Sequence, residues 1–373
     1  MIALLTLLPC AAVVLAVLVL RQNALIAAAA ALVTALALWA TGIYAPVKLD
    51  HLGHAISDAL VLEILVGAVV FLGLLFVEVS SRIGGLKALG DAIQSLGLSP
   101  PRTVILITLG IGVMLESLTG YGVSMLVTVP LLLQIVSRAK AIFLALIGMS
   151  LMPWGALSIS ALLGAELSGL SPQVLAAAIV TTSGPVAAVL PLFCLLLVPG
   201  SGLKDVAYAV LAGAVLIIGI ATTSHWIGVE VAGVGGGVAV ILFSLLFVSS
   251  GRSLSKSLAT PSILPYGLLI VGVVLQKLIA PRVIAGGIDP TIETDRVSFH
   301  VLNSPGIALL TIALLSIALQ SRLLRAETGR RLFHHVVARS WRALASIFLF
   351  LITARLLVEI GGTTALAGLV SQL

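Results

Sequence analysis

The sequence predicts an all-α integral membrane protein, a polytopic helix bundle, on three observations. Of the 373 residues, 60% are hydrophobic and only 9% are charged. The mean hydropathy is +1.25. The apolar residues form long runs, with basic residues spread singly between them. Soluble domains carry about 25% charged residues, so a soluble fold could not solvate this surface.

Ten apolar stretches are long enough to cross the hydrocarbon core as helices, which takes about 20 residues each. In chain order they are 2–20, 24–44, 59–79, 141–163, 173–198, 206–226, 231–249, 263–281, 305–321 and 343–360. The first lacks the preceding basic region of a signal peptide, so we expect it to be retained as a span. The run "GVGGGVAV" within 231–249 predicts close helix packing.

A longer apolar stretch, 103–136, determines the topology. Arg102 precedes it, and Arg138 and Lys140 follow it. Basic residues concentrate in cytoplasmic loops. With the N-terminus outside, this bias holds along the whole chain only if 103–136 enters and leaves on the cytoplasmic side. We therefore predict a re-entrant hairpin of two half-helices, within a single integral membrane domain that covers 1–373. The net charge of +6 fits this topology, and no nucleic-acid partner is expected.

The sequence "MLESLTGYGVSML" (114–126) lies at the expected tip of this hairpin. Gly120 and Gly122 permit a non-helical backbone, which membranes tolerate only where it is buried in protein or lines a wet cavity. Glu116 is costly in hydrocarbon, and such residues usually serve function. Two interpretations stay open: Glu116 carries a proton or supports a substrate site, or it binds the free N–H groups of the tip.

The hydroxyls near this tip also allow two interpretations. Ser117, Thr119 and Ser124 could hold a carboxylate together with backbone N–H groups, or could cap free backbone. In the stretch 141–163, Pro153 removes a helical hydrogen bond. A break in the helix there would complete a substrate site that includes Ser150, Gly155 and Ser158, or it would be only a kink in a packed helix.

Arg355 and Glu359 form a further candidate pair, because residues four apart share one helical face. Either they form an ion pair with each other, or Arg355 binds a substrate carboxylate through two N–H groups.

Several segments, taken in order, resemble the L-lactate permease family: 76–133, "ALIGMSLMPWGALSIS" (145–160), "ATPSILPYGLLI" (259–270), "NSPGIALLTIALL" (303–315) and 339–369. The family carries a Glu-Gly-Ala-Ala-Gly-Phe-Gly-Thr-Pro signature, and the matching positions run from Glu116 to Ser124. Ser117-Leu118-Thr119 replaces Gly-Ala-Ala, and Val123-Ser124 replaces Thr-Pro, so the tip is bulkier here. The family continues past the position of Leu373 to a second hairpin, so we expect the chain to be incomplete at its C-terminus relative to the family.

The resemblance implies a proton-coupled carrier of lactate, glycolate or similar 2-hydroxy monocarboxylates, with an ion-transporter-like inverted-repeat fold. We expect a multi-pass symporter in the plasma membrane, whose partners are a small carboxylate, protons and lipid; its oligomeric state stays open. The alternatives are a non-transporting membrane subunit and a carrier of another organic anion. An enzyme is not expected, because the sequence pattern places no pair of catalytic groups together. No cofactor or metal is expected, because the two cysteines and six histidines show no ligand spacing.

Overall fold

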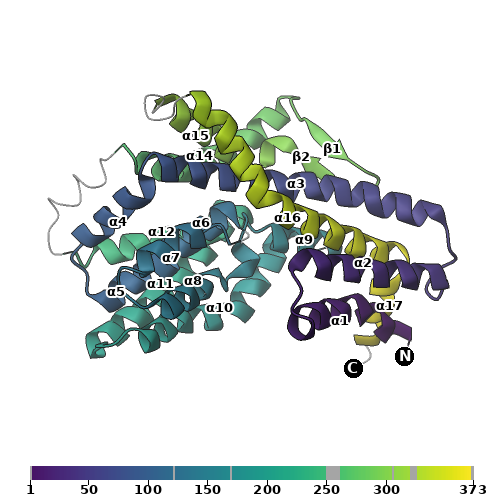
Figure 1. The fold of residues 1–373 in the computed structure, drawn as a ribbon, viewed down its shortest axis with the longest axis horizontal. Coiled ribbons are helices and arrows are strands. Elements are labelled where there is room, and N and C mark those ends of the chain that lie inside the picture. Colours follow the sequence, from purple (N-terminus) through teal and green to yellow (C-terminus); the bar gives the residue numbers. More distant parts are fainter. Residues whose placement is uncertain are drawn as a thin grey trace. The chain divides into compact units, whose positions relative to one another are not determined.

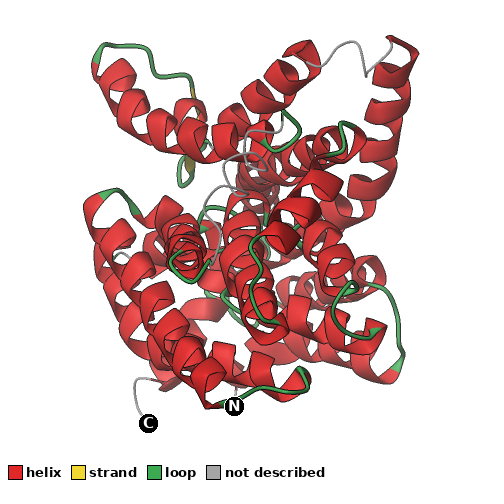
Figure 2. Cartoon of the chain, turned by 90° about the vertical axis from the view of Figure 1, so that its left-hand side faces the viewer, coloured by secondary structure: helices red, strands yellow, loops and turns green. Residues whose placement is uncertain are grey.

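The computed structural model describes residues 2–120, 122–168, 170–248, 261–304, 306–319 and 326–370, and helices dominate them (Figure 1, Figure 2). Contacts divide the chain into two compact units. Unit 1 comprises Met1–Ala68, Asp289–Val301 and His334–Leu373. Unit 2 comprises Val69–Ile288 and Leu302–Phe333.

Among the described residues, seven helices are long and apolar enough to cross a membrane. They are α2 (Ala24–Thr41), α3 (Leu49–Arg82), the helix Pro100–Thr119, α10 (Pro172–Leu197), α11 (Leu203–Trp226), α14 (Leu264–Ala285) and the segment Gly329–Glu359 of α16 (Ala326–Glu359). Three shorter apolar helices cover Ala3–Val19, Val229–Leu245 and Gly306–Leu319. The predicted all-α bundle with several membrane-spanning helices is confirmed at this level.

Two helices extend well beyond their predicted spans of 59–79 and 343–360. Helix α3 begins at Leu49, so Asp58 lies within it and not in a loop as predicted. Helix α16 begins at Ala326 and includes Arg339 and Arg342, which the prediction placed in a loop. Polarity alone does not end a helix, because charged side chains are compatible with helical backbone. A helix ends where the backbone leaves helical geometry, as α3 does before Gly84 at φ 81°.

The predicted stretch 141–163 is not one continuous helix but is interrupted near Pro153, as one interpretation of the sequence held. The chain there forms α8 (Arg138–Met149), a short turn η4 (Met152–Trp154) and α9 (Ile159–Ser168). Pro153 in the turn lacks an N–H group, and Ala156, Leu157 and Ser158 that follow have positive φ. These residues interrupt the helix.

Unit 1 packs helices around a small apolar core. Its elements are η1 (Ile2–Leu7), α1 (Leu8–Val14), η2 (Leu15–Val19), α2, parts of α3 and α16, strands β1 (Thr291–Glu293) and β2 (Ser298–His300), and α17 (Gly362–Val370). The core consists of Ala35, Leu38, Ala55, Leu356, Leu357 and Ile360. The strands form an antiparallel hairpin with Ile292 opposite Phe299. Strands this short are not evident in the sequence.

Unit 2 contains the remaining elements. They are parts of α3 and α16, α4 (Gly85–Ser95), α5 (Pro100–Ile105), η3 (Leu106–Gly112), α6 (Val113–Thr119), α7 (Met125–Leu132), α8, η4, α9, α10, α11, η5 (Val229–Val231), α12 (Ala232–Leu245), α14, most of η6 (Val301–Asn303) and α15 (Gly306–Leu319). The glycines of α12 bring its backbone against α6, as predicted. A Cβ on Gly237 would lie 2.6 Å from the backbone N of Met114.

Candidate functional site

The segment 103–136 forms a helix–break–helix hairpin within unit 2. Its first arm is the continuous helix Pro100–Thr119, made of α5, η3 and α6, and its second arm is α7. The arms lie against each other, because a Cβ on Gly112 would be 3.3 Å from Cγ2 of Thr128. Near the open end, Thr103 and Gln134 line the same cavity. The break is where the sequence predicts it; its re-entry from one membrane face stays a prediction.

Two glycines shape the tip between the arms. Gly120 has φ 67° and Gly122 has φ 78°, a left-handed region that glycine adopts without strain. The N–H of Gly120 closes the first arm by donating to the carbonyl of Glu116, at 2.7 Å. A Cβ on Gly120 would lie 2.4 Å from Cβ of Ala156. The tip therefore requires glycine at this position for space as well as for conformation.

Glu116 joins the two arms of the hairpin. Its side chain is buried, with the residue 4% exposed. Oε1 accepts from the N–H of Gly122 at 3.0 Å, and Oε2 accepts from Oγ of Ser124 at 2.6 Å. The carboxyl thus occupies the donors at the start of the second arm, where an anion is favoured. This is the tip-capping arrangement that the sequence left open.

A second break meets the first. Ala156, Leu157 and Ser158 have φ of 48°, 55° and 58°, and each left-handed non-glycine residue costs about 1–2 kcal/mol. Hydrogen bonds to the hairpin offset this cost. The N–H of Ala156 donates to the carbonyl of Glu116 at 3.1 Å, and that of Leu157 donates to the carbonyl of Ser117 at 2.6 Å. The structure therefore brings the two predicted groups of site residues in unit 2 together, with the interruption after α8 bonded to the last turn of α6.

The predicted site hydroxyls mostly bind backbone carbonyls. Oγ1 of Thr119 donates to Leu115, Oγ of Ser150 to Ile147 and Oγ of Ser158 to Val229, at 2.6–2.7 Å. Each of the three is therefore a backbone cap in this structure.

The other predicted residues of unit 2 shape or pack the site. Ser117 is buried beside α12, where a Cβ on Gly233 would lie 2.1 Å from its Oγ. Gly155 accepts through its carbonyl from the N–H of Ser158, at 2.9 Å. Neither residue reaches the Glu116 carboxyl through a described hydrogen bond.

Arg355 and Glu359, in unit 1, do not pair with each other as one sequence interpretation held. The Nε of Arg355 donates to Oδ2 of Asp58 at 3.0 Å, and its Nη2 donates to the same oxygen. Glu359 accepts from Nη1 of Arg296. Two side chains on one helical face need not pair with each other when neighbouring elements place an opposite charge beside each of them.

Asp58 is the residue that sequence reasoning missed. It is 2% exposed, and its Oδ1 accepts from Oγ1 of Thr294 at 2.5 Å. Asp58 therefore ties α3 to both α16 and the β1–β2 hairpin. The available signal was an aspartate directly before the apolar run that begins at Ala59, on a stretch compatible with a helix.

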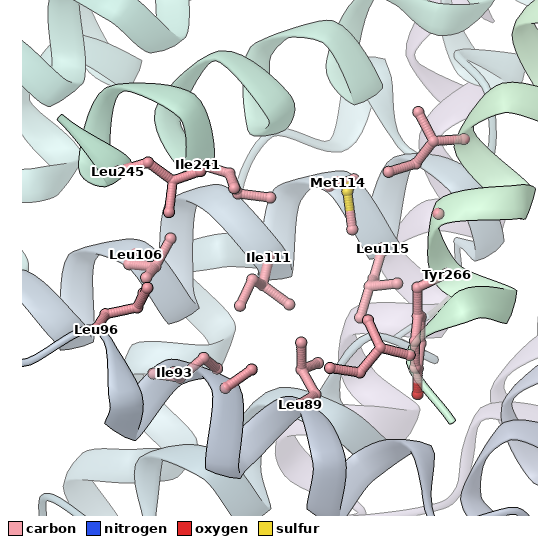
Figure 3. Close-up of a pocket in the computed structure, with 14 residues that line it drawn as sticks. Leu89, Ile93, Leu96, Leu106, Ile111, Met114, Leu115, Ile241, Leu245 and Tyr266 are labelled. Atoms are coloured by element: carbon pink, nitrogen blue, oxygen red, sulfur yellow. The ribbon is translucent and has the colours of Figure 1, made fainter. Parts of the chain in front are cut away.

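A cavity of about 200 Å³ lies beside the first arm of the hairpin (Figure 3). Figure 3 shows Leu89 and Ile93 of α4 facing Ile111 of η3 and Leu115 of α6, and Ile241 also lines the space. The lining is almost wholly apolar, with Tyr266 as its one hydroxyl-bearing member. Such a cavity suits a hydrocarbon group and offers nothing to hold a carboxylate.

Within the described residues, no group of three or more His, Cys, Asp or Glu side chains could hold a metal ion. No family model, curated protein or solved structure matches the chain.

Proposed function

We propose that the chain is a secondary transporter of small monocarboxylates of the lactate and glycolate class, driven by proton symport. One observation carries the proposal: inside a chain of apolar helices, the interruption between α8 and α9 meets the end of the hairpin's first arm. The N–H groups of Ala156 and Leu157 bind the last turn of α6, and Ala156 lies beside the break at Gly120. Non-helical backbone at membrane depth is tolerated where it is buried or lines a cavity, and broken helices of this kind form transporter substrate sites.

The resemblance of Glu116–Ser124 to the L-lactate permease signature supports a carboxylate substrate. It also supports an inverted-repeat architecture, which belongs to the proposal together with the re-entrant hairpin, the plasma-membrane location and an outside N-terminus. The proposal does not include catalysis.

Glu116 suggests how a proton and an anion are coupled. Its carboxylate holds the N–H of Gly122 and the hydroxyl of Ser124, the donors that a substrate carboxylate would use. Protonation of Glu116 weakens its hold on these donors, because a neutral carboxyl is a weaker acceptor than a carboxylate. A proton on Glu116 therefore favours binding of the substrate anion at the same tip.

Uptake into proteoliposomes tests the proposal. We expect labelled lactate or glycolate to accumulate when the outside is acidic, and Glu116→Gln to lose this drive while keeping substrate exchange. Thr181→Ala in α10 is the matched control, because its exposed hydroxyl bonds only within its own helix and lies outside the candidate site. Folded wild-type protein that accumulates neither substrate above protein-free vesicles refutes the proposal. Full proton-driven uptake by Glu116→Gln leaves Glu116 as a structural cap only.

Cysteine labelling tests the re-entrant hairpin. In a background without Cys10 and Cys194, single cysteines at Ser99 and Ser137 flank the segment. We expect an impermeant thiol reagent to label both from the cytoplasmic face. Labelling of the two positions from opposite faces would show one crossing and reverse the orientation of every later span.

A non-transporting membrane subunit is the second candidate. The observation that favours it is that the hydroxyls of Thr119, Ser150 and Ser158 are all engaged by carbonyls. It predicts a stable protein whose thermal unfolding is unchanged by lactate or glycolate, whereas a carrier should be stabilised by its substrate.

A further inference from the structure

Glu63 is a carboxyl group within the long apolar helix α3, in unit 1. Its Oε2 is buried and has no hydrogen-bond partner in the described part of the chain. Its Oε1 lies 3.5 Å from the position that a Cβ on Gly67 would take, and Cδ2 of Leu344 lies 3.4 Å from the same point. The carboxyl thus rests in the space left by a glycine, against an apolar side chain of α16.

The length of α3 places Glu63 inside the hydrocarbon core. The helix runs from Leu49 to Arg82, and a span uses about 20 residues. The earliest such window is about 49–68 and the latest about 63–82. Every window between them contains Glu63. Asp50 and Arg82, by contrast, lie at the ends and can reach an interface.

The other carboxyls in the described spans and in the shorter apolar helices have donors, except Asp50, which is exposed. Asp58 binds Arg355 and Thr294, Glu116 binds Gly122 and Ser124, and Glu359 binds Arg296; the further pairs are Glu78 with Arg82, Asp205 with Arg102, and Glu230 with Lys277. Among the described residues, Oε2 of Glu63 is the one carboxylate oxygen that is both buried and without a partner.

The charged groups of the elements around Glu63 are engaged elsewhere or exposed. On α16, Arg355 is held by Asp58, and the other basic residues in its unit 1 part are exposed: His334, His335, Arg339 and Arg342. On the β1–β2 hairpin, Arg296 is held by Glu359. Helix α2, which packs on α3 through the core that includes Ala55, has no charged residue.

The titratable groups of α3 itself lie on other turns. His51 and His54 are in its first turns, and His54 faces Glu359 at 3.9 Å. The buried Nδ1 of His51 has no partner. Among the described residues, therefore, no positively charged side chain neutralises an ionised Glu63 carboxylate.

We propose that Glu63 is a proton-binding site in the membrane region, occupied by a proton in this conformation. An ionised carboxylate without donors in apolar surroundings is costly, so the neutral acid is the stable form. Release breaks the O–H bond heterolytically: the proton passes to water and the electron pair stays on the carboxylate. This site is separate from Glu116 and does not depend on the substrate.

Infrared spectroscopy of the protein in lipid nanodiscs tests the site without transport. At neutral pH we expect the carbonyl band of a protonated carboxylic acid, lost in Glu63→Gln and retained in Glu78→Gln, the matched change on the same helix. A band that Glu63→Gln leaves intact overturns the proposal. The infrared measurement detects protonation and not uptake, so it tests the Glu63 site even if the protein does not transport lactate.

Carbodiimide labelling decides the same question in the wild-type chain if Glu63→Gln does not fold. The reagent adds to a protonated carboxyl in apolar surroundings and rearranges to a stable N-acylurea. Peptide mass mapping should place the adduct on Glu63, with a yield that falls as the pH rises. Labelling of other carboxyls with Glu63 unmodified overturns the assignment.

Discussion

The buried pair of Asp58 and Arg355 offers the sharpest test of unit 1. Asp58 is 2% and Arg355 7% exposed, so a change of either one leaves a charge that water cannot reach. Removing one member of a buried ion pair typically costs about 3–5 kcal/mol. We therefore expect Asp58→Asn and Arg355→Met each to lower the free energy of unfolding by about this amount.

The double variant should be far less affected than the sum of its parts. With both charges removed, the desolvation penalty of the pair disappears, and replacing buried pairs by uncharged groups is often neutral. We expect Asp58→Asn with Arg355→Met to lose no more than about 2 kcal/mol, because only the hydrogen bonds of Arg355 and Thr294 to a carboxylate are then missing. The coupling free energy between the two positions is then at least about 4 kcal/mol, the difference from the sum of the single effects.

Reversible unfolding in mixed detergent micelles measures these free energies. Arg82→Gln is the control, because the pair that Arg82 makes with Glu78 is partly exposed and should cost about 1 kcal/mol or less. Single effects that simply add in the double variant would refute the pairing of Asp58 with Arg355. They would also return Glu359 as the candidate partner of the guanidinium.

Three further predictions concern local features. Gly120→Ala should lower the free energy of unfolding by about 3 kcal/mol or more, because the new Cβ would clash with Ala156 and the backbone has a positive φ. Gly53→Ala, with open space around it, should raise the free energy of unfolding by up to about 1 kcal/mol. Unfolding in the same micelles measures both. Ser124→Ala should cost about 1.5–3 kcal/mol through a lost bond to a buried carboxyl, and Ser150→Ala close to nothing by the same assay. A hydrogen bond from His300 lowers the pKa of Asp289. The stabilisation that this bond gives the folded protein is therefore fully present above the unfolded pKa of about 3.9 and is lost as the pH falls through the folded pKa. A carboxyl NMR titration in which Asp289 has an unshifted midpoint contradicts this.

The sequence could predict where helices exist and where they break. Apolar runs identify membrane helices by length, and the glycines and the proline of the two breaks are local signals that act within a few residues. This is why the tip at Gly120 and the interruption near Pro153 lie where the pattern indicates. The capping role of Thr119 is one of the two alternatives that the sequence leaves open, because hydroxyls in broken helices commonly bind free carbonyls.

Helix ends and long-range partners could not be predicted in the same way. Hydropathy locates the apolar middle of a helix but not its last turn, so Asp58 was assigned to a loop. Its partner Arg355 is 297 positions away, and no local pattern links them. The face shared by Arg355 and Glu359 suggested a pair, but helical spacing establishes only proximity between side chains. Which charge each one meets depends on the elements packed against them.

Glu63 and Glu116 show why a carboxyl in an apolar stretch has no fixed role. In an intact helix, backbone N–H groups beyond the first turn already bond to carbonyls one turn earlier. Glu63 therefore finds no backbone donor. Beside a break the N–H groups are free, and Glu116 takes one of them from Gly122 together with the hydroxyl of Ser124. The backbone around each glutamate thus determines whether its charge is stabilised by donors or is removed by a proton. A break beside Glu63 would offer this carboxyl free N–H groups, and an intact helix around Glu116 would remove the N–H group that Glu116 binds.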